Sequence, residues 1–310
     1  MKRPTSRNPL SASGVRDLEN QRAGRQDRLA KHPRAEATMR LVPSLTSSVL
    51  LACLSAGTAL AVDVTTCNQF VQGTANLVAD LDCSGHPGRA IQIIGSLHLN
   101  GFKLTGNSAG PVVYCNIGSC TIVGPGTLTG GSKGVSGDGG VKVVDATIEF
   151  NSGDGVFTFR AARIQGSSVI SNNGGDGVHA SRTVSIVGGK LALPDVVVSD
   201  NGGHGIEAGR AVRVQDAVVS GNANDGIRTE AAASLLSTVV QGNGLDGVRA
   251  LRAQLRETTA TGNRTAPACG VSADCADVAS ERKPTLRGAS TCEVSLNTAG
   301  GGTWGICTLD

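Results

Sequence analysis

The strongest pattern of apolar and polar positions is a short strand-like segment that recurs at a nearly constant interval between positions 151 and 263. In each unit a glycine precedes an apolar residue, and a small residue follows two places later, as in Gly226-Ile227-Arg228-Thr229. This alternation is typical of a β-strand with one buried side, and no apolar stripe of helical period accompanies it. A repeat of about 21 residues predicts a solenoid, here an all-β, single-stranded parallel β-helix with coils stacked about 4.8 Å apart.

A turn of the form Asn-x-x-Asp-Gly introduces each of these strands, with His204 in place of Asp in one copy. The spacing of the copies is nearly constant except for one longer step, which contains an insert around 188–191 that we expect to form a loop. Because Asn and Gly tolerate the left-handed backbone of a sharp corner, we interpret the asparagines as turn residues. We expect five of them to stack at one corner, namely Asn151, Asn173, Asn201, Asn222 and Asn243.

The alternation after each turn assigns the side chains to the two sides of the strand. The inward positions are expected to be Val156, Val178, Ile206, Ile227 and Val248, followed two residues later by Thr158, Ala180, Ala208, Thr229 and Ala250. The residues between them are expected to point outward, as Phe157, His179, Glu207, Arg228 and Arg249. Small inward residues suit a narrow cylinder, which explains how a chain with 2% aromatic residues can form a core.

The N-terminal segment up to Ala61 differs from the repeats in composition. Residues 1–38 are rich in arginine and lack apolar periodicity, so we expect them to be disordered or to come from a mis-assigned start codon. Residues 39–61 are predicted to be a secretory signal peptide, because a nearly uncharged apolar stretch ends on the small-x-small sequence Ala59-Leu60-Ala61. We assign residues 62–266 to the β-helix and residues 267–310 to a Cys-rich C-terminal cap with disulfides.

The same apolar stretch leaves an alternative open. Leu50-Leu51-Ala52-Cys53 loosely resembles a lipobox, which would make the protein a lipoprotein anchored at Cys53. The apolar run continues to Ala61, which favours the ordinary signal peptide. The stretch is short and interrupted by Pro43, so no membrane span is expected. We therefore expect a secreted protein, located outside the cell or in the cell envelope.

The charge balance changes when this leader is set aside. The leader holds ten Lys/Arg and four Asp/Glu, so the rest of the chain keeps 18 basic and 21 acidic residues, a net charge of −3. The basic character of the whole sequence therefore belongs to the leader. No nucleic-acid partner is expected, because such a partner requires a basic surface.

Cysteine usage agrees with export. Eight cysteines follow the leader, four before residue 121 and four after residue 268, with none in the repeats between them. This distribution predicts disulfides at both ends of the solenoid. We expect neighbours to pair, as Cys67–Cys83, Cys115–Cys120, Cys269–Cys275 and Cys292–Cys307. Zinc is not expected here, because no CxxC pair or nearby histidine accompanies the cysteines.

On its Asn-x-x-Asp-Gly-(Val/Ile) repeats, over roughly residues 75–265, the chain resembles the right-handed parallel β-helix proteins of the pectin-lyase-like superfamily. The resemblance implies a right-handed coil, and the Cys-flanked ends resemble those of exported bacterial members. The superfamily includes pectate lyases, polygalacturonases and mannuronan epimerases, beside members with no known activity. The resemblance is therefore specific for the fold and weak for the function.

The catalytic motifs of these enzymes are mostly missing. Gly203-His204-Gly205 matches the Gly-His-Gly of polygalacturonases, but no Asp-Asp pair or Arg-x-Lys accompanies it, and His204 stands where the other repeats have Asp. The Asp-Pro-His-Glu of the epimerases and the Arg-x-Pro-x-x-Arg of pectate lyases are absent. Sugar sites usually contain aromatic platforms, whereas Trp304 and Tyr114 both lie outside the regular repeats.

Part of the outward row is nevertheless a candidate ligand-binding site. It combines an acid, a base and two cations, as His179, Glu207, Arg228 and Arg249. The alternative is a solvated face on which Glu207 and Arg228 pair between adjacent coils. The aspartates of the turns, Asp154, Asp176, Asp225 and Asp246, invite calcium, but Asp-Gly is ordinary turn chemistry and His204 interrupts the series. We therefore expect no metal and no cofactor.

These observations favour a noncatalytic secreted protein with a structural role, or one that binds a polysaccharide or a cell-surface protein. The alternative is a lyase, hydrolase or C5-epimerase acting on an acidic polysaccharide. Cleavage of the known β-helix kinds needs two carboxylates around a glycosidic bond, or a base beside a charge-neutralising group at a uronic acid. The repeats contain single aspartates at a turn, which favours the noncatalytic interpretation.

Overall fold

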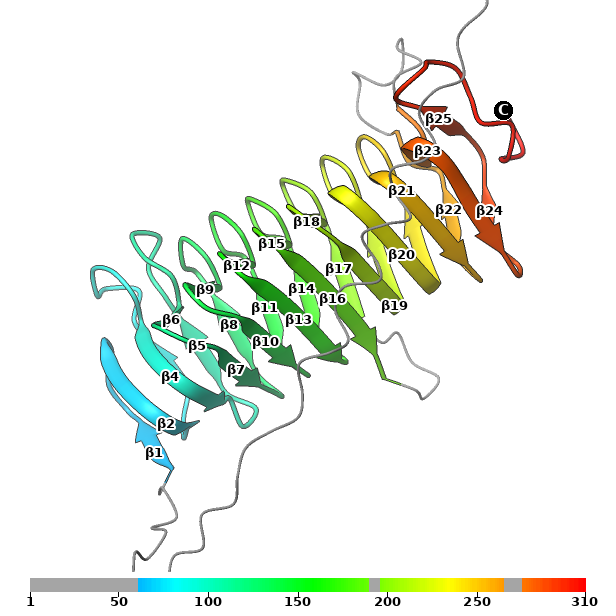
Figure 1. Cartoon of the computed structure of the whole chain (residues 1–310). Helices are drawn as coiled ribbons and strands as arrows, with labels where there is room; N and C mark the ends of the chain where they lie inside the picture. The colour runs from blue at the N-terminus through cyan, green and yellow to red at the C-terminus, as the bar shows by residue number, and fades with distance from the viewer. Residues whose placement is uncertain (1–60, 190–195, 265–274) are drawn as a thin grey trace, which may run out of the picture. The chain divides into compact units, whose positions relative to one another are not determined.

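The computed structural model describes residues 61–189, 196–264 and 275–310, and these residues form a parallel β-helix (Figure 1). Every strand pairing in it is parallel, between equivalent segments of successive coils, for example Val156 with Val178 and Val178 with Ile206. The described residues contain no helix, and hence none that is long and apolar enough to cross a membrane. The structure confirms the predicted right-handed parallel β-helix.

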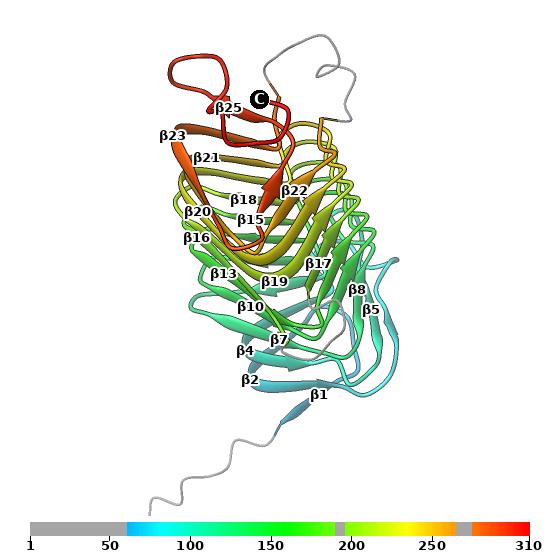
Figure 2. The ribbon, with the colours of Figure 1, turned by 90° about the vertical axis from the view of Figure 1, so that its right-hand side faces the viewer.

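Each coil contributes strands to three parallel sheets. Sheet 1 is formed by β2 (Gln69–Leu77), β4 (Ile91–His98), β7 (Cys120–Val123), β10 (Val141–Val144), β13 (Ala161–Gly166), β16 (Thr183–Gly188), β19 (Val212–Ser220), β20 (Ile227–Gln241), β21 (Val248–Arg256) and β23 (Val278–Arg287). The short strand β1 (Val62–Val64) pairs with the end of β2. Figure 2 shows these strands stacked coil upon coil.

Sheet 2 follows sheet 1 along each coil. Its strands are β3 (Leu81–Asp82), β5 (Lys103–Thr105), β8 (Thr127–Thr129), β11 (Thr147–Glu149), β14 (Val169–Ser171), β17 (Val196–Ser199), the C-terminal parts of β19 and β20, β22 (Thr259–Thr261) and β24 (Thr291–Cys292). The insert predicted around 188–191 lies between sheets 1 and 2, because β16 ends at Gly188 and β17 begins at Val196. Residues 190–195 lie outside the described ranges.

Sheet 3 follows the Asn-containing turn. It contains β6 (Val113–Cys115), β9 (Val135–Gly137), β12 (Val156–Thr158), β15 (Val178–Ala180), β18 (Ile206–Ala208), β25 (Ser295–Asn297) and the N-terminal parts of β2, β4, β20, β21 and β23. Because β23 and β25 continue this pairing, the coil extends into the segment expected to be a cap. The predicted inward residues of sheet 3 are all buried.

The asparagines of the repeat stack at the corner between sheets 2 and 3, as predicted. We call Asn151, Asn173, Asn201, Asn222, Asn243 and Asn263 the asparagine ladder; all are at most 5% exposed. Each Nδ2 donates to the Oδ1 of the next member at 2.8–3.0 Å, and that same Oδ1 accepts the backbone N–H of the preceding member. A second Nδ2 hydrogen goes to a backbone carbonyl, such as that of Ile170 for Asn201. The buried amides are therefore fully hydrogen-bonded.

The structure gives a different reason for the presence of asparagine at this corner from the one inferred from the sequence. The left-handed backbone lies one residue earlier, at Phe150, Asn172, Asp200, Gly221, Gly242 and Gly262, with φ between 52° and 66°. The ladder asparagines themselves do not have positive φ; they are selected for the amide side chain. The glycine four residues after each of the first five asparagines is required by close approach, since a Cβ at Gly205 would lie 2.6 Å from Nδ2 of Asn222. Interpreting Asn as a left-handed turn residue was therefore wrong.

Three of the predicted disulfides are present. Cys67–Cys83 and Cys115–Cys120 lie in the N-terminal coils and Cys292–Cys307 at the C-terminal end, with Cα–Cα distances of 5.6, 5.7 and 4.9 Å. The fourth predicted pair includes Cys269, which lies outside the described residues. So do the predicted signal-peptide segment up to residue 60 and the alternative lipid-anchoring Cys53.

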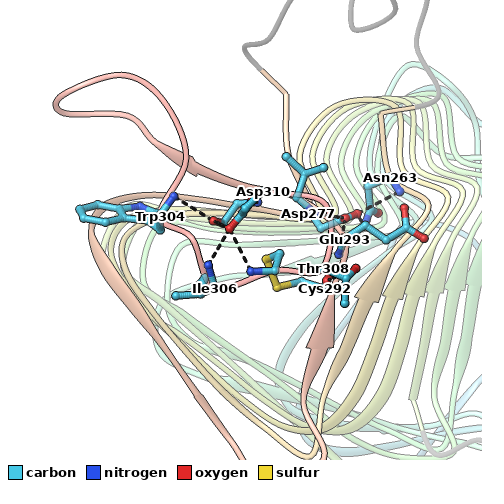
Figure 3. The surroundings of a disulfide bond; sticks show 11 residues. Asn263, Asp277, Cys292, Glu293, Trp304, Ile306, Thr308 and Asp310 are labelled. Atoms are coloured by element: carbon cyan, nitrogen blue, oxygen red, sulfur yellow. Dashed lines mark hydrogen bonds between the residues drawn. A yellow bond between two sulfur atoms is a disulfide. The ribbon is translucent and has the colours of Figure 1, made fainter.

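Acidic side chains close the last coil, beside the Cys292–Cys307 disulfide (Figure 3). Asp277 takes the place of the next asparagine, because its Oδ1 accepts hydrogen bonds from Nδ2 and from the backbone N–H of Asn263. Its Oδ2 accepts hydrogen bonds from the backbone N–H groups of Glu293 and Val294. The side chain of Asp310 accepts hydrogen bonds from residues such as Ser295 and Ile306. These carboxylates satisfy backbone donors that a following coil would otherwise bind.

Candidate functional site

The candidate site lies on the outer surface of sheet 3. The predicted outward residues Phe157, His179, Glu207, Arg228 and Arg249, here called the outer ladder, are direct neighbours in the parallel register of β12, β15, β18, β20 and β21. The first three are partly buried and the two arginines are exposed. The sheet therefore places all five predicted side chains in one row, one per coil.

The row continues toward the N-terminus with residues that sequence analysis had left out. Tyr114 and Ser136 precede Phe157 in the same register. The Tyr114 hydroxyl donates to Oδ2 of Asp138 at 2.5 Å, and this hydrogen bond is the main cause of the raised Tyr114 pKa. Arg89 lies 5.4 Å from the centre of the tyrosine ring. The sequence contained a signal for this extension of the row, because the interval of the repeat separates Tyr114 from Ser136 and Ser136 from Phe157.

An open hollow of about 430 Å³ adjoins this end of the row. Its lining includes Arg89, Pro111, Tyr114 and Ser136. The hollow combines a guanidinium, a phenol ring and apolar surface, which is the mixture of groups that orients a small polar ligand. Further along the row, Phe157 contacts two basic groups: Lys133 Nζ lies 4.6 Å from its ring centre and the His179 ring centre lies 5.2 Å away. The face therefore has two aromatic groups, the predicted outward Phe157 and also Tyr114, which lies outside the regular repeats.

A second row runs beside the outer ladder, along the turn that leads into sheet 3. We call Asp154, Asp176, His204, Asp225 and Asp246 the turn ladder. In it the side chain of each member accepts a backbone N–H from the next coil at 2.6–3.1 Å. The Oδ1 atoms of Asp154, Asp176, Asp225 and Asp246 accept from Asp176, His204, Asp246 and Ala276, respectively, and Nδ1 of His204 accepts from Asp225. His204 thus replaces an aspartate as an acceptor in the same position, as its place in the repeat predicted.

The two ladders meet at an acid–base cluster. His179 Nδ1 lies 3.0 Å from Oδ2 of Asp176, three residues earlier in the same coil, and 3.0 Å from Oε2 of Glu207 in the next coil. The side chains of His179, Asp176 and Glu207 are 30%, 13% and 28% exposed, so the cluster is reached from solvent. Sequence analysis considered Asp176 as a turn residue and as part of a calcium ladder, but did not group it with His179 and Glu207.

The ionisable groups of this cluster influence one another. Burial and the neighbouring Asp176 raise the pKa of Glu207. Burial also acts to raise the pKa of Asp176, but hydrogen bonds from His179 and from the backbone N–H of His204 outweigh it, so this pKa is lowered. The hydrogen bond to Asp176 raises the pKa of His179. Both shifts favour the charged form of the group concerned, an imidazolium at His179 and a carboxylate at Asp176.

The C-terminal end of the row is cationic on its surface. Arg228 Nε lies 3.8 Å from Oε1 of Glu207, so the predicted pairing between adjacent coils occurs, although it is loose. Arg249 Nη1 lies 3.1 Å from Oδ2 of the buried Asp246. Burial, followed by the nearby Asp225 carboxylate, raises the pKa of Asp246 to about 7. Lys133 and Asp154 form a further ion pair at 2.9 Å beside Phe157.

Comparisons with known proteins provide structural neighbours and no family. No family model matches the chain, and no curated protein matches it. Among solved structures, the A-modules of the Azotobacter vinelandii mannuronan C-5 epimerases AlgE4 and AlgE6 are similar, each with 16% identity and a TM-score of 0.34. The match with AlgE4 covers 66% of this chain and 60% of that module. The match with AlgE6 covers 74% of this chain and 76% of that module. The chain thus spans about 60% of the AlgE4 module, and likeness at this level transfers no activity to it.

Proposed function

We propose that the protein binds an extended carbohydrate polymer along the outer surface of sheet 3 without cleaving it. The observation that carries this proposal is the single row of side chains formed by Tyr114, Phe157 and the rest of the outer ladder. Successive coils of a β-helix lie about 4.8 Å apart, so the row presents a regular series of contacts parallel to the axis. Repeated, individually weak contacts of this kind suit a polymer better than a compact ligand.

The chemistry of the row favours an acidic polymer. Aromatic rings supply apolar faces against which sugar rings pack, and Tyr114 and Phe157 are both accompanied by a cationic group, Arg89 and Lys133. Arg228 and Arg249 add guanidinium groups at the other end, suited to bidentate binding of carboxylates. The acidic pair Asp176 and Glu207 interrupts the cations, so binding would be localised on either side of it.

Binding can be measured by affinity electrophoresis and calorimetry with polygalacturonate, alginate and a neutral glucan. We expect Phe157→Ala and Arg228→Ala each to weaken binding to the acidic polymers by about tenfold, since each removes one strong contact. Arg163→Ala, on the exposed side of sheet 1, is the matched control and leaves the affinity unchanged. Equal affinities for all three variants would contradict the assignment of the face, and no binding to any of the polymers would contradict the function.

A second candidate is proton transfer on an acidic polysaccharide, as in a lyase or an epimerase. The observation in its favour is the Asp176–His179 hydrogen bond, which orients an imidazole on the same face. Against it, His179 Nδ1 is held between two carboxylates, and Glu207 contacts the imidazole instead of facing it across a bound sugar. Release of unsaturated ends from pectin or alginate, or inversion at C5 of alginate residues without chain cleavage, abolished by His179→Ala, would establish this second candidate and contradict the noncatalytic proposal.

We further propose that the protein is exported, as its signal sequence predicts, and that it acts outside the cell or in the envelope. The three disulfides support an oxidising compartment, because such bonds are rare in the cytosol. Sequencing the N-terminus of the protein recovered from an expressing host tests this proposal. We expect a mature chain beginning at Val62; a lipidated chain beginning at Cys53 would establish the lipoprotein alternative.

A further inference from the structure

The cluster of Asp176, His179 and Glu207 has the geometry of a metal-binding site. Among the described residues it is the one group of three acidic, histidine or cysteine side chains whose donor atoms all lie within 4.8 Å of one another. Two of the three separations, from His179 Nδ1 to each carboxylate, are 3.0 Å. Donor atoms about 2.1 Å from one ion lie about 3.0 Å apart at a right angle and about 3.4 Å apart at the tetrahedral angle. The two separations from His179 therefore fit donor atoms that share one ion, and the two carboxylate oxygens lie within 4.8 Å of each other.

The hydrogen bonding of the cluster leaves a place for a cation. One Nδ1–H of His179 can donate well to one carboxylate only, yet the carboxylates of Asp176 and Glu207 both lie within hydrogen-bonding distance of it. The two acidic groups also stand close to each other, an arrangement that a positive charge between them stabilises, whether from a protonated His179 or from a bound cation. A divalent ion bound by Nδ1 and by one oxygen from each acid would satisfy all three groups together.

The surroundings hold the donor atoms in position. The other oxygen of Asp176, Oδ1, accepts the backbone N–H of His204 at 2.7 Å, which leaves Oδ2 directed toward His179. Phe157 packs against the imidazole ring from the preceding coil, with the two ring planes 32° apart. Arg228 approaches Oε1 of Glu207, the oxygen that does not face His179. Outer contacts of this kind orient ligands and strengthen metal binding.

We propose that Asp176, His179 and Glu207 bind one divalent transition-metal ion of the zinc class, through Oδ2, Nδ1 and Oε2. The imidazole nitrogen distinguishes this site from the calcium ladder considered on sequence grounds, because calcium prefers oxygen ligands. The proposal departs from the sequence-based expectation of no metal. Three protein ligands leave coordination positions open on the solvent side, where water or an anionic ligand completes the shell. Metal binding stands apart from the proposed polymer binding, because it is measured without sugar.

The test uses the full chain without a polyhistidine tag, stripped with EDTA and dialysed against ZnCl₂. Metal content is measured by mass spectrometry, and affinity by calorimetry with ZnCl₂ and, for comparison, CaCl₂. We expect one zinc ion per chain, with affinity reduced at least about 50-fold in His179→Ala and about 10-fold in Glu207→Gln, as for the loss of a ligand. His86→Ala, which removes an exposed histidine elsewhere, is the control and binds zinc like the wild type.

A second readout separates site binding from loss of the fold. With Co²⁺ in place of zinc, the wild type is expected to show visible absorption bands of a nitrogen-and-oxygen site, which Glu207→Gln alters while its circular dichroism stays unchanged. The proposal is overturned if the wild type retains no zinc after dialysis, if His179→Ala retains as much as the wild type, or if calcium binds more tightly than zinc. None of these outcomes bears on polymer binding, which is measured with metal-free protein.

Discussion

Asn201 and His204 occupy the first and fourth positions of one turn, but their ladders are built differently. The asparagine ladder repeats one amide, which is both donor and acceptor, so each member pairs with an identical neighbour. The turn ladder repeats a carboxylate, which only accepts, so its members cannot pair with one another when ionised. They use backbone N–H groups on one oxygen, and the second oxygen is left for Lys133, His179 or Arg249.

This difference explains where function can arise in a repeat protein. A self-complementary side chain makes every coil equivalent, which stabilises the stack and leaves nothing for a ligand. An acceptor-only side chain requires a partner of another kind, and two of these partners, His179 and Arg249, come from the outer ladder. The cluster of Asp176, His179 and Glu207 is the point where those partners include a second acid. The same sequence repeat thus produces a uniform core and a varied surface.

The most destructive change is expected in the asparagine ladder. Asn201→Ala leaves Nδ2 and N of Asn173 without their acceptor and the Oδ1 of Asn222 without its side-chain donor, all in a buried corner. Because unpaired buried polar groups cost about 1–3 kcal/mol each, we expect a loss of about 4 kcal/mol in the free energy of unfolding, measured with urea. Asn224→Ala, a half-buried residue of the next turn, is the control and costs less than about 0.5 kcal/mol. Similar losses for both would contradict the role given to the ladder.

The end of the ladder provides a sharper test, because it ends in an acid. Asp277→Asn keeps the shape of the side chain but turns an N–H₂ toward the backbone N–H groups of Glu293 and Val294 (Figure 3). We expect this donor-to-donor contact to cost about 3 kcal/mol in urea unfolding. If the amide were tolerated without loss, termination of the ladder would not require an acceptor-only group.

The turn ladder is expected to respond to pH where the asparagine ladder does not. The folded pKa of Asp246, about 7, lies above the ordinary value, so the stability it contributes is present at low pH and is lost as the pH rises through 7. Relative to Asp246→Asn, the wild type should therefore lose about 2 kcal/mol of unfolding free energy between pH 5 and pH 8. A difference between the two proteins that stays constant over this range would show that Asp246 does not titrate there.

The smallest expected effect concerns the position before the asparagine ladder. Phe150 has φ of 52° and is 61% exposed, where other coils have Asn, Asp or Gly. Phe150→Gly should raise the free energy of unfolding by about 0.5–1 kcal/mol, because it relieves a left-handed backbone at a bulky residue. Phe159→Gly, at another exposed phenylalanine without positive φ, is expected to give no gain. A gain of the same size in both variants would assign the effect to lost apolar exposure.

Much of the fold was accessible from the periodicity of the sequence. The inward rows, the stack of asparagines and three disulfide pairs followed from spacing, because a solenoid converts equal sequence intervals into spatial neighbours. The candidate site could be predicted from the sequence only in part. His179 and Glu207 were placed correctly in one row. Asp176 was considered only for the turn and for a calcium ladder, and Tyr114 was set aside because it lies outside the regular repeats.

The sequence by itself determined the parallel coil and the side of the strand on which each repeat residue lies, since both depend on local alternation and a constant period. Only the tertiary structure decided which atoms of neighbouring side chains come into contact and where the turn ladder reaches the outer ladder. The distance of 3.0 Å from His179 to two acids, one of them in the next coil, depends on how the turn aims Asp176 into the row. Spacing fixes the neighbours of a side chain in a ladder, whereas its rotamer and hydrogen bonds fix what it can bind.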